Sequence, residues 1–322
     1  MHKNPMAAAL VIGSVVAALT AGVGAGVRPV AAANVINVEF NFTPYVGDAA
    51  TDDEVQTVAG MARVFINNIP YAVQEVTEQE LPVLFDEREI SPSVWLPVES
   101  CGGALRKGKN TLRIEFEPKS ASKAYRARLA WASVMDESTE EGSDGSYSST
   151  NMSDAGVDDK EAKGKVVFER EFMADFAADM PWHHYAAVTA LTDADKKALT
   201  ALVAQRIEMF KPDFAAFYAL LEANTEMDIT GMKEAKCLDA AYAAGARIAA
   251  PKPADLDIVT TGGPAVVIRA KDGNLFVPED MSAFEKIEDP EIQMCIGMAF
   301  ATAFPPQIVV VRAPSGAWEA AY

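Results

Sequence analysis

Residues 36–42 read INVEFNF, a strict alternation of apolar and polar side chains. Because successive side chains of a β-strand point to opposite faces of the sheet, this period of two predicts a strand with one buried face. The same alternation returns in residues 112–116 (LRIEF) and 125–131 (YRARLAW). Shorter apolar runs between them lie beside turn-forming residues. Residues 34–135 are therefore predicted to form an antiparallel β-sandwich domain, which residues 164–176 could complete.

One phrase within this region has a more particular form. Residues 105–114 read LRKGKNTLRI, in which a short loop with glycine and asparagine leads into a core strand. The phrase resembles an edge-and-turn phrase of galactose-binding-like and immunoglobulin-like β-sandwich modules. The resemblance implies a sandwich fold but no ligand, because modules of this kind bind sugars, proteins or nothing.

The second half of the chain changes to helical periodicity. Thr192 and Asp195 have the spacing of a capping box, and apolar residues follow them at helical intervals. Another helix is predicted over residues 231–247. Pro290 follows an aspartate and begins a further apolar helix, because proline is favoured in the first helical turn. No motif in this half points to a known family.

Two hairpins are predicted among these helices. Residues 272–273 (Asp-Gly) are typical of a two-residue hairpin turn, and apolar runs at 266–268 and 275–277 flank them. The second hairpin turns at residues 314–316 (Pro-Ser-Gly). Residues 177–322 are therefore predicted to form an α+β domain with helices on a small antiparallel sheet. The fold class predicted for the whole chain is a two-domain protein.

The charge of the chain is strongly negative and unevenly placed. It has 46 acidic and 28 basic side chains, a formal net charge of −18, which argues against nucleic acid as a partner because phosphate backbones are bound by Lys and Arg. Residues 136–159 contain eight acids and no base, mixed with Ser and Gly. Such a segment buries little apolar surface, so residues 136–163 are predicted to be an acidic linker or insertion.

A basic stripe precedes this acidic segment. Eight basic residues fall between Arg106 and Arg128, and the strand pattern places Arg113, Arg126 and Arg128 on outward faces. These three could be solvated side chains that partly pair with acids. They could also bind an anionic ligand, or dock the acidic segment 136–159 of the same chain.

The first 33 residues have the features of a secretory signal peptide. Lys3 precedes an apolar stretch over residues 7–27, and small residues lead to a cleavage site near Ala33. We therefore expect a secreted or periplasmic protein. An uncleaved segment would instead anchor the chain, and membrane contact is expected only in that case.

Histidine and methionine offer one candidate metal site. Met180, His183 and His184 lie within six residues of one another, and thioether and imidazole ligands suit a soft ion such as Cu(I). Adjacent histidines point in different directions, which opposes chelation of one ion. Ordinary junction residues are the alternative interpretation, and we expect no cofactor.

The three cysteines suggest one bond. In an oxidising compartment Cys237 and Cys295 are expected to form a disulfide, because both lie in the predicted second domain. Cys101 then remains as a passive thiol, because a nucleophilic cysteine needs a positioned base.

These observations favour an exported, non-catalytic binding protein for an unidentified protein, glycan or small-molecule ligand. Nucleophile, nucleotide and zinc-protease motifs do not occur in the mature sequence. The alternative is a secreted hydrolase that acts on glycans or esters through carboxylates, with the sandwich as an accessory module. Periplasmic copper binding is a minor alternative. No catalytic residue can be named from the sequence.

Overall fold

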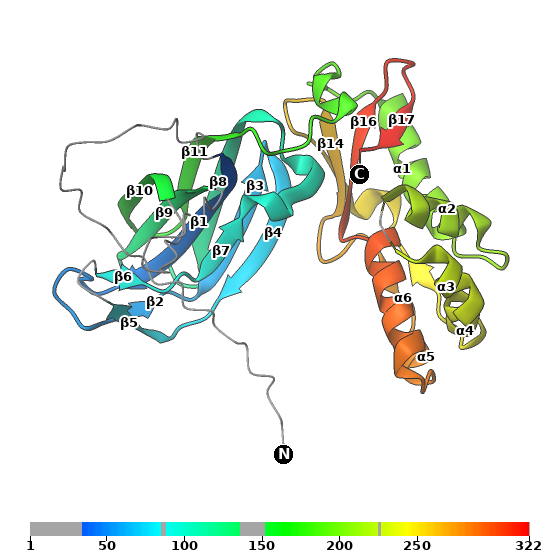
Figure 1. The fold of residues 1–322 in the computed structure, drawn as a ribbon, viewed down its shortest axis with the longest axis horizontal. Helices are drawn as coiled ribbons and strands as arrows, with labels where there is room; N and C mark the ends of the chain where they lie inside the picture. The colour runs from blue at the N-terminus through cyan, green and yellow to red at the C-terminus, as the bar shows by residue number, and fades with distance from the viewer. Residues whose placement is uncertain (1–33, 85–87, 136–151, 225–226, 322) are drawn as a thin grey trace, which may run out of the picture. The chain divides into compact units, whose positions relative to one another are not determined.

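The protein is strand-rich and antiparallel, with a few helices in its second half (Figure 1). The structure, a computed structural model, describes residues 34–84, 88–135, 152–224 and 227–321. The predicted signal segment, residues 1–33, lies outside these ranges. Among the described residues, no helix combines the length and the hydrophobicity that a bilayer crossing requires.

The first sheet is built around its long strands β1 and β9. Its order is β10–β9–β1–β2–β5–β6, and β7 also pairs with β1. β1 and β9 stay paired from Val35↔Met135 to Tyr45↔Arg126. The strands are β1 (Val35–Val46), β2 (Glu54–Thr57), β5 (Glu80–Leu84), β6 (Glu89–Ile90), β7 (Val94–Pro97), β9 (Tyr125–Met135) and β10 (Met152–Ala162).

The second sheet has the order β11–β8–β3–β4. Asn67 and Asn68 both have positive φ, and they form the tight turn that joins β3 to β4. The apolar run at residues 166–168 begins β11, within the segment 164–176 that the sequence suggests could complete the sandwich. The strands are β3 (Gly60–Ile66), β4 (Ile69–Val76), β8 (Gly108–Pro118) and β11 (Val166–Ala174).

Aromatic side chains from both sheets make one core. Phe40 and Phe42 of β1 are fully buried, as their alternating pattern predicts. The Phe40 ring lies 5.3 Å from that of Phe172, and the Phe42 ring lies 5.8 and 5.9 Å from those of Phe116 and Phe168, centroid to centroid. These edge-on and tilted contacts stabilise the packing of the first sheet against the second.

The second half contains two smaller sheets and six α-helices among the described residues. The sheets have the orders β13–β14–β16–β17 and β12–β15. The strands are β12 (Ile248–Ala249), β13 (Leu256–Thr260), β14 (Ala265–Ala270), β15 (Val277–Pro278), β16 (Gln307–Arg312) and β17 (Trp318–Ala320). The helices are α1 (Asp193–Glu208), α2 (Ala215–Asn224), α3 (Ile229–Ala235), α4 (Cys237–Ala243), α5 (Ser282–Glu285) and α6 (Pro290–Ala303).

The β13–β14–β16–β17 sheet contributes to two hydrophobic cores. Val267 and Val309 belong to the core of the first two sheets, whereas Val266 and Val310 belong to the core under the helices. Because alternate residues of these strands enter different cores, both faces of the sheet are buried. The antiparallel, strand-rich fold with helices is therefore confirmed, but its division into two domains is not.

The predicted linker over residues 136–163 is wrong in its second part. Residues 152–162 form β10, which pairs with β9, while residues 136–151 lie outside the described ranges. Asp159 lies opposite Arg128 in the register, and its carboxylate accepts bonds of 2.9 and 3.3 Å from the guanidinium. The pairing of β10 with β9 is thus stabilised by opposite charges across the strands as well as by backbone hydrogen bonds, although β10 has few apolar side chains.

Two predictions in the second half are also wrong. The helix expected over residues 231–247 is broken at Lys236, whose left-handed φ of 53° ends α3 before α4 begins. The Asp-Gly hairpin does not form, because β14 already pairs with β13 on one edge and β16 on the other. Val277 pairs instead with Ala249 of β12. The capping box, the helix that begins at Pro290 and the last hairpin are confirmed.

We expect the sheet shared by the two cores to make unfolding a single transition. Val267→Ala and Val266→Ala each remove apolar atoms from a fully buried site on opposite faces. Each is expected to lower the free energy of unfolding by about 2 kcal/mol, shifting the same transition in scanning calorimetry. Val73→Ala, at a side chain that is 65% exposed, is the control and should change it by less than about 0.5 kcal/mol. Two transitions that respond separately to the two substitutions would contradict the shared sheet.

Candidate functional site

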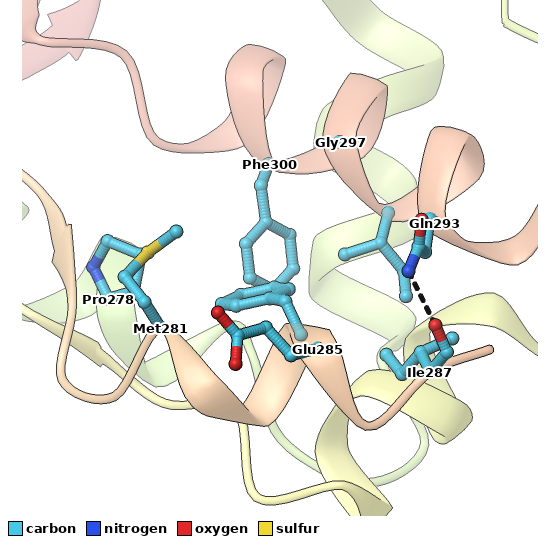
Figure 2. A pocket seen from close by; sticks show the side chains of 9 residues that line it. Pro278, Met281, Glu285, Ile287, Gln293, Gly297 and Phe300 are labelled. Carbon is cyan, nitrogen blue, oxygen red and sulfur yellow. Dashed lines mark hydrogen bonds between the residues drawn. The ribbon is translucent and has the colours of Figure 1, made fainter. Parts of the chain in front are cut away.

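An apolar groove lies between α6 and the segment that contains α5. Its volume is about 420 Å³. Figure 2 shows Pro278 and Met281 at one end, Gln293 and Ile287 at the other, and the Phe300 ring between them. We call it the α5–α6 groove, and its lining residues are Pro278, Met281, Phe284, Glu285, Ile287, Gln293, Ile296, Gly297 and Phe300.

Hydrogen bonds at helix starts set the two walls of the groove. Asp289 caps α6 by accepting bonds from the backbone of Glu291 and Ile292. Asp280 accepts bonds from the backbone and hydroxyl of Ser282, and these bonds lower the pKa of its carboxyl. At the far end, the Gln293 side chain donates to the Ile287 carbonyl at 2.5 Å (Figure 2). Residues of both walls thus have fixed positions.

The floor of the groove is continuous with the second core. The Phe300 ring lies 5.6 Å from that of Phe284 and 4.9 Å from that of Phe210 on the core side, both in edge-on contact. Ala283 and Ile287 anchor the α5 segment in the same core. A ligand in the groove would therefore meet a packed aromatic floor that needs little rearrangement.

The helix that forms one wall is tied to its neighbour by a disulfide. Cys237 at the start of α4 bonds to Cys295 in α6, with their Cα atoms 6.2 Å apart. The bond places the inward side of α6 against α4 and leaves the groove side free. The two cysteines named from the sequence are therefore brought together, next to a site that the sequence did not reveal.

Exposed methionines and carboxylates lie on the two segments that form the groove. Met281, Met294 and Met298 are 63, 61 and 50% exposed, and the last two lie one turn apart on α6. Residues 279–291 contain six exposed carboxylates and one cation, Lys286. We call the carboxylates the acidic rim; they are Glu279, Asp280, Glu285, Glu288, Asp289 and Glu291.

The three arginines of the predicted basic stripe do not form one site. Arg126 and Arg128 lie on β9 in the first sheet, whereas Arg113 lies on β8 in the second. Arg128 pairs with Asp159, and Arg126 pairs with Asp48 at 3.0 Å. Part of the acidic segment thus lies against part of the stripe, the docking alternative that the sequence left open.

The candidate metal residues are already engaged. His183 Nδ1 accepts from the Met180 backbone at 3.3 Å, so its Nε2 carries the proton that is donated to the Gly103 carbonyl at 3.1 Å. His184 lies 2.7 Å from the Asp179 carboxylate instead. Within the described residues, no cluster of three or more His, Cys, Asp or Glu could hold a metal ion. The geometry does not bring these side chains together as ligands.

Cys101 lies buried in the 3-10 turn at residues 98–104. Burial raises the pKa of its thiol to about 12. A thiol with this pKa is protonated at neutral pH and is a poor nucleophile. The geometry therefore offers this cysteine no catalytic role.

Sequence reasoning missed the α5–α6 groove because its residues are spread over 23 positions and carry no motif. A usable signal was present in α6. Met294, Gly297, Met298 and Ala301 make an exposed apolar strip on a helix whose other side is buried. A contiguous exposed apolar strip on a protein surface is typical of an interaction site.

Removing the disulfide should destabilise the wall of the groove. Cys237→Ser with Cys295→Ser opens a link across 58 residues, and loops of this length typically contribute about 2–4 kcal/mol. Urea denaturation of the double variant should show that loss. The single variant Cys101→Ser, at a buried free thiol, is the control for the loss of a sulfur atom. Equal losses in the two proteins would contradict the role of the bond.

Acidification should weaken the fold through His183. Burial lowers the pKa of His183 below its usual value, and Arg106 adds to the effect. Between the lowered folded pKa and the unfolded pKa of about 6.5, the unfolded chain binds more protons. Stability should therefore fall as pH drops below about 6.5. His183→Gln should flatten this slope in chemical denaturation measured from pH 7.5 to 5, and an unchanged slope would contradict the role of His183.

Comparison with known proteins leaves the site to be interpreted from its own geometry. The chain matches no family model, no curated protein and no solved structure. Residues 105–114, which carry the phrase-level resemblance to β-sandwich modules, follow the 3-10 turn and form a short loop and the first part of β8. The groove and its acidic rim are therefore the features from which a function can be proposed.

Proposed function

We propose that this protein is an exported, non-catalytic binding protein whose α5–α6 groove takes a cationic amphipathic peptide segment. The observation that carries the proposal is the combination of an apolar groove with the acidic rim around it. Recognition of this kind places the apolar face of a helix in a groove and leaves the charged face outside. The partner is thus defined by its chemistry: apolar residues at helical spacing, flanked by Lys or Arg.

The apolar side of the proposal rests on the groove floor and its methionines. Phe300 and Ile296 supply buried apolar surface, and Gly297 leaves open space above it. Unbranched methionines are polarizable and adapt to differently shaped partners. Met281, which lines the groove, would cover one side of an inserted side chain.

The charge of the partner follows from the acidic rim. Six carboxylates against Lys286 within residues 279–291 create a negative field around the mouth of the groove. A cationic segment would associate faster and more tightly there, whereas an acidic one would be repelled. Glu285 is both a lining residue and a rim residue, so it is the carboxylate closest to an occupant.

Among the described residues, the geometry of neither cleft supports the hydrolase alternative. A glycosidase needs two carboxylates that converge across the substrate, one of them with a raised pKa. Of the described residues, Glu285 is the one carboxylate that lines the α5–α6 groove, and Glu115 is the one that lines a second cleft on the outer face of β3 and β8. Shifted pKa values among the described carboxyls all run downward, as at Asp48 and Asp195.

We also propose a β-sandwich followed by an α+β part, in a protein that is secreted or periplasmic. Residues 34–135 with 164–176 would form a β-sandwich, and 177–322 an α+β part that shares one sheet with its core. The facing aromatic rings support the first assignment, and the helices packed on one face of that sheet support the second. Secretion or a periplasmic location rests on the signal features of residues 1–33 alone. Amino-terminal sequencing of the mature protein would test cleavage near Ala33.

A peptide of Leu and Lys, about 16 residues long and patterned as an amphipathic helix, tests the groove. Fluorescence anisotropy should show saturable binding that weakens as salt is added. Gly297→Trp places a large side chain where the structure has open space. It should lower the affinity at least about tenfold, since losing one buried Leu-sized anchor costs about 1.5–3 kcal/mol. Glu285→Lys should lower it about fivefold.

Matched controls separate the groove from general stickiness. Ala201→Trp adds the same side chain at an exposed position of α1 and should leave the affinity unchanged. The same peptide with Glu in place of Lys should not bind. Alanine is favoured over glycine inside a helix, so Gly297→Ala should raise the free energy of unfolding by about 0.5–1 kcal/mol. This rise would show that the fold tolerates a side chain at position 297. Equal binding of both peptides, or unchanged binding by Gly297→Trp, would refute the proposal.

A further inference from the structure

A second cleft, of about 660 Å³, lies where the turn between β13 and β14 meets strands β3 and β8. Four cationic side chains line it: Arg63, Arg113, Lys165 and Arg269. Glu115 is the one carboxylate among the described residues that line it. The chain as a whole has a net charge of −18, so a cluster of four cations stands out from the rest of the molecule.

The strand register fixes the first wall of the cleft. Phe65 of β3 lies opposite Arg113 of β8, and the Arg113 guanidinium carbon is 3.8 Å from the centroid of the Phe65 ring. Glu115 forms ion pairs with Arg113 and with Lys165, the latter at 2.7 Å. A half-buried carboxylate and an aromatic face therefore hold two cations in place before any ligand arrives.

The second wall comes from the β13–β14 hairpin. Arg269 of β14 donates from Nε and Nη2 to the Asp257 carboxylate at 2.9 and 2.7 Å. The hairpin turn is held to the second sheet by a bond of 3.2 Å from the Asn68 side chain to the Thr261 carbonyl. Cations from both walls thus border the same space, from elements that are far apart in the chain.

Existing ion pairs do not neutralise the cleft. Arg63 pairs with Glu117 at 3.3 Å, and the side chains of this pair are 40 and 60% exposed. With Glu115 and Asp257, three carboxylates face four cations. The exposed pair of Arg63 with Glu117 and the partly exposed pair of Arg269 with Asp257 contribute little to stability, so an incoming anion can share these two arginines at small cost.

We propose that this cleft binds a small organic anion that carries two or more oxyanion groups. Guanidinium groups bind carboxylate and phosphate through paired hydrogen bonds, and their presence on two walls suits a ligand charged at more than one point. The volume suits a small molecule. This second site is independent of the α5–α6 groove, shares none of its residues and has the opposite charge preference.

Titration calorimetry on the full chain tests the proposal with two probes, citrate and fructose 1,6-bisphosphate, at constant ionic strength. Saturable binding of either probe supports it. A preference for citrate identifies carboxylates as the recognised groups, and a preference for the bisphosphate identifies phosphates. Arg63→Gln and Arg269→Gln, one from each wall, should each weaken the preferred probe about tenfold, because each removes charge-assisted hydrogen bonds.

Arg128→Gln is the matched control. It removes an arginine that is likewise paired with a carboxylate but lies on β9, outside the cleft. The Arg128→Gln variant should bind the preferred probe as tightly as the unmodified chain does. Arg269→Lys should recover part of the affinity that Arg269→Gln loses. Melting temperatures without ligand report whether each variant is folded. No saturable binding of either probe below about 1 mM, or an equal loss in Arg128→Gln, overturns the proposal.

Discussion

The structure depends most on the burial of both faces of the β13–β14–β16–β17 sheet. β14 and β16 pair along five residues, and their alternate side chains enter different cores. A sheet of this kind cannot lose either set of contacts without exposing an apolar face. The strands and helices of the second half are therefore held against the first two sheets by packing as well as by the chain itself. Among the described residues, both sides of position 177 thus contribute side chains to the core of the first two sheets.

The same sheet determines where each candidate site can form. Its second face carries the core from which Phe300 reaches the floor of the α5–α6 groove. Its β13–β14 turn supplies one wall of the cationic cleft. Both sites thus combine a rigid base with a more exposed edge: methionines at the groove, and partly solvated guanidinium groups at the cleft. Rigid support beneath an adaptable surface is a common arrangement for binding sites.

The sequence predicted local structure well where one face of an element is buried. The alternation at residues 36–42, the cap at Thr192 and Asp195, and the start of α6 at Pro290 depend on neighbouring residues, and all are confirmed. The failed predictions depend on partners that are distant in the chain. The Asp-Gly hairpin fails because β13 and β16 occupy both edges of β14. The linker prediction fails because residues 152–162 find a partner strand in β9, whose Arg128 pairs with Asp159 of β10. The groove escaped prediction for another reason: its lining is spread over 23 residues and forms only when the α5 segment packs against α6.

Net charge alone describes this molecule poorly. Acidic side chains gather in residues 279–291 beside the groove, while the cations of the cleft come from β3, β8, β14 and the residue just before β11. Fields from charge clusters act over about 8–10 Å at physiological salt, so each cluster acts on its own surroundings rather than through the total. A ligand approaching either site meets the local sign of charge first. Two sites of opposite preference can therefore exist on one acidic chain, and the total of −18 excludes neither a cationic partner nor a small anionic one.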